Sequence, residues 1–145
     1  MVNSNNLLTN LKKSLFIVLL LCAVALSAIS QPAYAQISDF KITASDGAAS
    51  DNFGYSVSIS SDYAIVGAWQ DDNNGTYSGS AYLFKRTDTT WAQEAKLLPS
   101  DAVTGDFFGF SVAISGDYAV VGAPFDDDNG TNSGSAYVYK RTGTS

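Results

Sequence analysis

Two stretches of this chain decide its fold: FGYSVSISSDYAIVGAW at residues 53–69 and FGFSVAISGDYAVVGAP at residues 108–124. They lie 55 residues apart, and the correspondence extends outward without a gap, so that residues 41–90 and 96–145 are identical at 30 of 50 aligned positions. Self-similarity at a fixed period of this length is typical of proteins built from repeated supersecondary units. We therefore interpret the chain as two copies of one structural unit.

Each copy contains a series of short strand patterns. In residues 53–59 apolar side chains alternate with Gly and Ser, the period of two expected of a strand with one apolar face. After a tight turn, residues 63–68 form a continuous apolar run, which is typical of a strand buried on both faces. A third strand is predicted at 80–86 and a fourth at 91–98. The second copy repeats the first three strands at 108–114, 118–123 and 135–141.

Four antiparallel strands joined by tight turns and repeated around an axis form the blades of a β-propeller. The predicted fold class is therefore all-β, with antiparallel four-stranded blades in two repeats of 55 residues. The first blade spans residues 53–98, and the second spans 108–141 with three strands. A β-sandwich made of two similar halves is the alternative, because regularly spaced short strands also suit sandwiches.

The motif residues of both copies resemble a known family. The motif positions are Phe53, Gly54, Gly67 and Ala68 in the first copy and Phe108, Gly109, Gly122, Ala123 and Pro124 in the second. This pattern is similar to the FG-GAP repeats that build the N-terminal propeller of integrin α-subunits and occur in many bacterial exported proteins. The first copy departs from it at Trp69, where the family has Pro, a position past the strand. The resemblance covers residues 37–145 and implies a blade-per-repeat propeller with a role in recognition, often adhesion.

The number of repeats leaves the predicted ring open. A propeller needs about four blades or more, and only two repeats are present. Residues 36–43 align with 91–98 and are predicted to form a lone fourth strand with no blade before it. The chain is then part of a longer propeller or, if complete, a homo-oligomer in which residues 36–43 of one copy add to the 135–141 edge of the next.

The first 35 residues differ in kind from the repeats. Lys12 and Lys13 precede an apolar stretch at residues 15–29, and Ala33-Tyr34-Ala35 places small residues where a signal peptidase cleaves. The alternative, an uncleaved membrane anchor, needs about 20 apolar residues, more than this stretch supplies. We predict a signal peptide at residues 1–35, cleavage after Ala35, and a secreted or periplasmic product with no membrane attachment.

The composition of residues 36–145 limits the classes of ligand and of activity to be expected. This segment carries all 14 acidic residues but only six Lys and Arg, a net charge of −8. Binding of nucleic acid or of anionic membranes is not expected, because both need clustered basic residues. The segment also has no Cys and no His, so it lacks the usual thiol nucleophile and general base, and we predict that it is not an enzyme. The alternative is an accessory domain of a larger exported hydrolase.

Two acidic loops are the only predicted metal candidates. They span residues 71–75 and 126–130, and oxygen-rich loops suit Ca²⁺. A standard Ca²⁺ loop has ligands at its first and twelfth positions. In the first loop these positions are Gln70 and Ala81, and in the second they are Phe125 and Ala136, none of which is a carboxylate. The family's ion loop, between the first two strands, is reduced to two residues. We expect structural turns with no cofactor and no required metal, and weak Ca²⁺ binding stays open. The candidate ligands would be Asp71, Asp72, Asn74, Asp126, Asp127 and Asp128.

Two further expectations concern glycines and aromatic residues. Gly67 and Gly122 end the buried strand of each copy and are predicted to leave room for neighbouring backbone. Aromatic side chains could form sugar-binding platforms, but their strand positions favour packing within or between blades. These residues are Tyr55, Tyr63, Trp69, Tyr82 and Trp91. The predicted partner is an extracellular protein or glycan.

Overall fold

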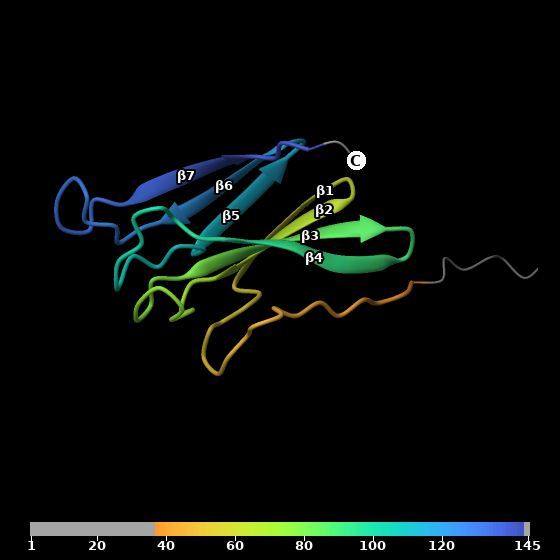
Figure 1. The fold of residues 1–145 in the computed structure, drawn as a ribbon, viewed down its shortest axis with the longest axis horizontal. Helices are drawn as coiled ribbons and strands as arrows, with labels where there is room; N and C mark the ends of the chain where they lie inside the picture. The colour runs from red at the N-terminus through yellow and green to blue at the C-terminus, as the bar shows by residue number, and fades with distance from the viewer. Residues whose placement is uncertain (1–36, 144–145) are drawn as a thin grey trace, which may run out of the picture. The chain divides into compact units, whose positions relative to one another are not determined.

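A computed structural model describes residues 37–143, and these residues form two antiparallel β-sheets and no helix (Figure 1). The first sheet has the order β1-β2-β3-β4 and the second the order β5-β6-β7. This arrangement confirms the all-β prediction of one blade per repeat in a ring that is not closed. The strands are β1 (Ser56–Ser60), β2 (Tyr63–Ala68), β3 (Ser80–Thr87), β4 (Thr90–Leu97), β5 (Ser111–Ser115), β6 (Tyr118–Ala123) and β7 (Ser135–Lys140).

The first strand of each sheet begins later than the alternation predicts. Strands were expected from Phe53 and Phe108, whereas β1 and β5 begin three residues further on. Gly54 and Gly109 explain the difference, because their φ angles of +94° and +88° lie in the left-handed region, which a strand cannot contain. The repeat nevertheless keeps its register, since β1 pairs with β2 just as β5 pairs with β6.

The sheets pack face to face, with β1 and β2 of the first sheet against β5 of the second. One core cluster lies between the sheets and includes Ile65 and Ala81 from the first and Val121 and Phe108 from the second. A second cluster, around Tyr82 and the other buried residues of β2 and β3, lies on the far face of the first sheet. The buried central strand in each repeat agrees with the continuous apolar runs at 63–68 and 118–123.

The lone fourth strand predicted at residues 36–43 is not formed, since residues 37–43 contain no β-pairing. A strand needs a partner for its backbone hydrogen bonds. The edge of β3 that a fourth strand would occupy is already taken by β4, so residues 37–43 have no strand edge to pair with in the first sheet. Ile42 and Ala44 instead pack against the far face of the first sheet. Leu97, which aligns with Ile42, packs in the same way against the core between the sheets.

The FG motif joins the two blades. Phe108 is fully buried, with its ring edge-on to Tyr137 and Tyr139 at centroid distances of 5.4 and 6.2 Å. Gly109 follows it at the point where the second blade touches the first. A Cβ on Gly67 would collide with the carbonyl oxygen of Gly109, so the predicted packing role holds at Gly67. At Gly122 the only close atom is Ser111 Oγ of the same sheet, and no neighbouring backbone fills the space.

The predicted signal peptide, residues 1–35, lies outside the described residues. Among residues 37–143, no helix has the length and apolar character to cross a membrane.

Candidate binding site at the repeat junction

The acidic loops form turns whose carboxylates accept hydrogen bonds from the protein itself. Asp71 is buried, and its Oδ1 accepts a bond from the Asn73 backbone N–H at 2.9 Å. Its Oδ2 accepts bonds from the Tyr82 hydroxyl at 2.7 Å and from Lys96 Nζ at 2.8 Å. Burial raises the pKa of Asp71, but Lys96 and Tyr82 outweigh it and hold that pKa below its ordinary value. Asp72 accepts the backbone N–H of Tyr77 at 2.7 Å.

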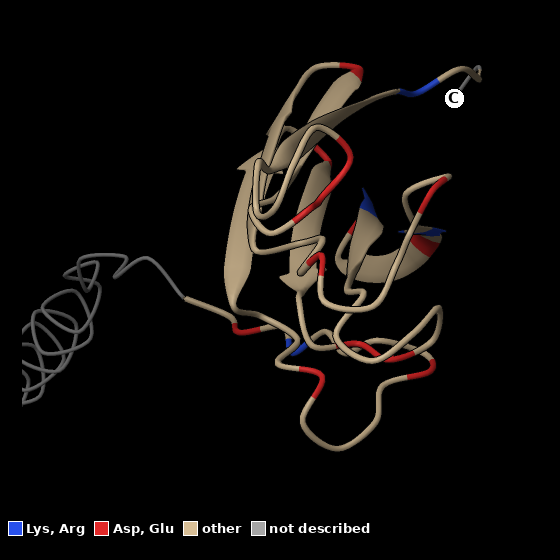
Figure 2. Ribbon diagram, turned by 90° about the vertical axis from the view of Figure 1, so that its left-hand side faces the viewer, with Lys and Arg blue, Asp and Glu red and all other residues tan. Residues whose placement is uncertain are grey.

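The second loop repeats this geometry with different surroundings. Asp126 accepts the Asp128 backbone N–H at 3.0 Å and the Tyr137 hydroxyl at 2.7 Å, and these two bonds lower its pKa. Asp127 accepts the backbone N–H of Asn132 at 2.6 Å. No side-chain hydrogen bond of Asn74 is found within the described segment, and no group of three or more acidic residues there is arranged to hold a metal ion. Acidic residues lie mostly in loops and turns (Figure 2).

The aromatic residues singled out from the sequence separate into two groups. Tyr82 and Tyr63 are buried, and Trp91 packs against the cluster on the far face of the first sheet. Tyr55 and Trp69 instead contact each other, at a centroid distance of 5.7 Å, next to the loop between β2 and β3. These two residues belong to a larger cluster whose other members the sequence did not reveal.

This junction cluster combines side chains from both repeats. Trp69 is its centre and contacts Phe107 at 4.6 Å and Phe110 at 6.0 Å between ring centroids. Tyr55 also contacts Phe110, at 5.1 Å, and Phe125 contacts Phe107, at 4.9 Å. Most of these pairs are edge-to-face, which is a favourable geometry for aromatic rings. The six members of the junction cluster are Tyr55, Trp69, Tyr77, Phe107, Phe110 and Phe125.

Part of the junction cluster faces solvent. Tyr55, Tyr77 and Phe125 are exposed large hydrophobic residues, whereas Trp69 is half-buried. The indole Nε1 of Trp69 is buried and has no hydrogen-bond partner in the described part of the protein. A buried N–H without an acceptor carries a desolvation cost, so this atom needs an explanation beyond packing.

Two members of the junction cluster have backbone conformations unsuited to their side chains. Tyr77 and Phe107 have φ angles of +57° and +59°. In the other repeat the same positions are Asn132 and Asn52, with φ angles of +54° and +55°. Asn tolerates the left-handed region, whereas a bulky residue there is an outlier. Each aromatic side chain therefore stands where the fold itself favours Asn.

All six members of the junction cluster occupy positions at which the repeats differ. The Asn52–Gln70 hydrogen-bonded pair of the first repeat aligns with the edge-to-face Phe107–Phe125 pair of the second, and Trp69 aligns with Pro124. Residues shared by the copies build the blades, whereas these repeat-specific residues meet at one place. The sequence signal that could have located the site is thus the list of mismatches between the copies rather than the matches.

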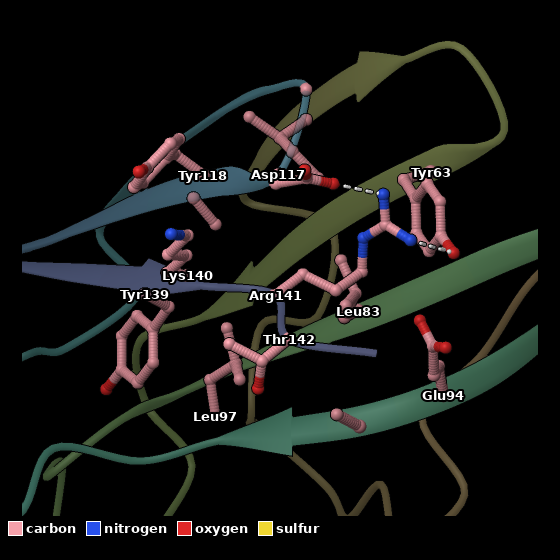
Figure 3. A pocket seen from close by; sticks show the side chains of 14 residues that line it. Tyr63, Leu83, Glu94, Leu97, Asp117, Tyr118, Tyr139, Lys140, Arg141 and Thr142 are labelled. Carbon is pink, nitrogen blue, oxygen red and sulfur yellow. Dashed lines mark hydrogen bonds and ion pairs between the residues drawn. The ribbon is translucent and has the colours of Figure 1, made fainter. Parts of the chain in front are cut away.

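A cavity opens between the sheets at the end of the strands opposite the junction cluster (Figure 3). Arg141 lies beside it and joins the sheets, since its Nη1 donates to the Tyr63 hydroxyl at 2.7 Å and its guanidinium lies 4.1 Å from the centre of the Tyr63 ring. Its Nη2 forms an ion pair with the carboxylate of Asp117. Glu94 and Leu97 on β4 and Tyr139 on β7 line the remaining walls.

Comparison with protein families places the chain. The family model of the FG-GAP repeat matches residues 38–84 and 91–139, which together cover well over half of the sequence. The chain belongs to the FG-GAP repeat family. The first matched FG-GAP repeat contains β1, β2 and most of β3. The second contains β4, which belongs to the first sheet, followed by β5, β6 and β7. No curated protein matches the chain.

Proposed function

We propose that this FG-GAP chain is an exported, non-catalytic recognition module that binds a neutral glycan at the junction cluster. The observation that carries the proposal is the convergence of six aromatic residues, four of them aromatic in one repeat only, on one partly exposed site. Exposed aromatic rings offer flat apolar surfaces, and those of Tyr55 and Tyr77 suit the apolar faces of sugar rings.

The groups beside the junction cluster suit an uncharged ligand with hydroxyl groups. Asn52, Gln70 and Asp72 flank the aromatic residues and supply amide and carboxylate groups. Asp72, whose carboxylate accepts the backbone N–H of Tyr77, is acidic and disfavours an anionic ligand.

The non-catalytic part of the proposal rests on how the acidic side chains are used. Asp71 and Asp126 are the most enclosed carboxylates of the two loops, and both accept bonds from backbone and tyrosine groups. Their lowered pKa values keep them ionised, whereas a general acid at neutral pH needs a raised pKa.

A binding experiment with two swapped residues tests the proposal. The purified chain is applied to an array of neutral oligosaccharides, alongside Tyr77→Asn and Phe107→Asn, which install the residue of the other repeat. We expect binding by the parent chain and a loss of roughly tenfold or more in each variant, since a stacking residue is worth about 1 to 3 kcal/mol. Thermal stability should stay equal or rise, because Asn relieves the left-handed strain.

The control is Tyr118→Asn, which removes an exposed tyrosine at the other end of the strands and should leave binding unchanged. An array on which the parent chain binds no glycan, or on which all three variants bind equally well, would rule out this site. Capture of a protein by the same surface, lost in the same two variants, would redirect the proposal from glycans to proteins.

A further inference from the structure

The contact between the two sheets shows how one FG-GAP blade covers the next. The first sheet contributes Ile65, Ala81 and Leu83 to this contact. The second sheet contributes Val112 and Ile114, from β5. We call the first set the forward face of a blade and the second set the backward face.

Because the repeat is duplicated, each face occurs a second time and is uncovered. The forward face of the second sheet consists of Val120, Ala136 and Val138, which align with Ile65, Ala81 and Leu83. Val138 is 67% exposed and Val120 39%, whereas Ile65 is 0% exposed. The backward face of the first sheet contains Val57 and Ile59, which align with Val112 and Ile114 and are 68% and 66% exposed.

The glycines show the same pattern. Gly109, on the backward side of the second blade, lies so close to Ser80 that a Cβ would collide with its carbonyl oxygen, whereas Gly54 has no atom within 4 Å of that position. Gly67 meets Gly109, whereas Gly122 meets only a serine of its own sheet. The chain thus carries both halves of its internal contact at opposite ends, each left open.

The charges identify the segment that would complete the second blade. In the first blade Lys96 Nζ, on β4, lies 2.8 Å from both Asp46 and Asp71. The aligned carboxylates of the second blade, Asp101 and Asp126, both accept the Tyr137 hydroxyl, at 2.9 and 2.7 Å, and have no lysine between them. Lys41 aligns with Lys96 and is exposed.

The register of β3 and β4 specifies where that lysine would go. Tyr82 pairs with Lys96, and Ala81 with Leu97. Shifted by one repeat, these pairs become Tyr137 with Lys41 and Ala136 with Ile42. The free edge of β7 has no strand beside it in the described part of the chain, and residues 39–44 already lie against the first sheet as a fourth strand of a preceding blade would.

We propose that a second copy of this chain docks head to tail onto the first. Its residues 39–43 add to β7 as the fourth strand, Lys41 enters between Asp101 and Asp126, and its Val57 and Ile59 cover Val120 and Val138. The contact is heterologous, so copies continue until the rotation closes a ring. Two to four copies of the two described blades give the four to eight blades of known propellers.

Cross-linking tests the strand register directly. In a Cys22→Ser background, Ile42→Cys is combined with Ala136→Cys in the full chain, produced by export from a bacterial host. Directly paired positions of adjacent antiparallel strands are close enough for a disulfide. We expect covalent dimers and larger species without reductant. The control combines Thr43→Cys with Ala136→Cys; a shift of one residue points the side chain to the other face, so cross-linking should fall sharply.

Sedimentation velocity of the same exported chain tests the charge contact. The parent chain should sediment as an assembly of two to four copies at micromolar concentration, and Lys41→Glu should weaken association roughly tenfold or more. Lys85→Glu makes the same charge change on the face already covered within the chain and should leave association intact. Asp101→Lys combined with Lys41→Glu should restore it. A folded monomer for the parent chain, or equal cross-linking in both cysteine pairs, overturns the proposal.

Discussion

At the scale of single residues, the two repeats share many scaffold residues and differ at the junction cluster. Positions shared by both copies, such as Gly67 and Asp71, hold turns and allow close backbone approach. Positions that differ, such as Trp69 and Phe107, meet in the junction cluster.

Gly67 should tolerate a side chain much less well than Gly122. Gly67→Val would drive a side chain into the Gly109 backbone of the other sheet, whereas Gly122→Val meets only the Ser111 side chain, which can turn away. We expect Gly67→Val to lower the free energy of unfolding by about 1 to 3 kcal/mol or more. Urea denaturation of both variants measures the difference, and equal midpoints would show that the sheets do not touch there.

Asp71 should make stability depend on acid pH. Its folded-state pKa lies below the ordinary value of 3.8, so its contribution is complete well above pH 3.8 and is lost as pH falls below that value through the folded-state pKa. Asp71→Asn removes an ionised partner of Lys96 and should cost about 3 kcal/mol at pH 7. In urea denaturation from pH 7 to pH 2, the difference in free energy of unfolding between parent and variant should become smaller as the pH falls.

The control for this experiment is Asp72→Asn, whose carboxylate is exposed and accepts one backbone bond. Its free energy of unfolding should differ little from that of the parent at neutral pH. A constant gap for Asp71→Asn across the whole range would contradict the assigned role of its charge.

At the scale of elements, β1 stabilises the inner edge of the next sheet through its serines. Ser58 Oγ accepts the backbone N–H of Ile114 at 3.2 Å, and Ser56 Oγ donates to the carbonyl oxygen of Gly109 at 2.8 Å. Ile114 lies on β5, the edge strand of the second sheet, whose outer N–H groups have no strand partner. The polar side of β1 therefore packs inward, while Val57 and Ile59 on its apolar side stay exposed.

Ser58→Ala should destabilise the contact between β1 and β5. The substitution leaves the part-buried Ile114 N–H without its acceptor, which should cost about 1 to 2 kcal/mol. Ser115→Ala is the matched control, because Ser115 is exposed on β5 and should cost only a few tenths of a kcal/mol. Chemical denaturation compares them, and faster hydrogen exchange at Ile114 in Ser58→Ala alone would locate the effect.

At the scale of the described blades, two sheets share one core, and the outer face of the second sheet stays exposed at Val138, as does that of the first sheet at Val57 and Ile59. Arg141, which follows β7, donates a hydrogen bond to Tyr63 on β2 and so links the two sheets (Figure 3). This contact lies at the end of the strands away from the junction cluster. The aligned Arg86 pairs only with Asp62, an exposed partner at 2.5 Å, and joins nothing across sheets. The same residue type thus gains an added role where a neighbouring blade is present.

Arg141→Ala should therefore cost more than Arg86→Ala. Loss of the Tyr63 hydrogen bond and of the cation–π contact should lower the free energy of unfolding by about 1 kcal/mol. Arg86→Ala should lower it by a few tenths, as is usual for exposed ion pairs. Thermal denaturation of both variants at low and high salt measures the two losses of stability. Equal losses in Arg141→Ala and Arg86→Ala would show that Arg141 does not bridge the sheets.

The sequence by itself determined the all-β class, the two blades and their buried central strands, because the repeat and the apolar runs at 63–68 and 118–123 are local patterns. Only the tertiary structure decided that 37–43 form no strand, since pairing depends on a partner strand. The junction cluster also needed the fold: Trp69 and Phe107 meet only when two blades stack. Contacts between repeats arise from packing, so alternation within one repeat could not predict them.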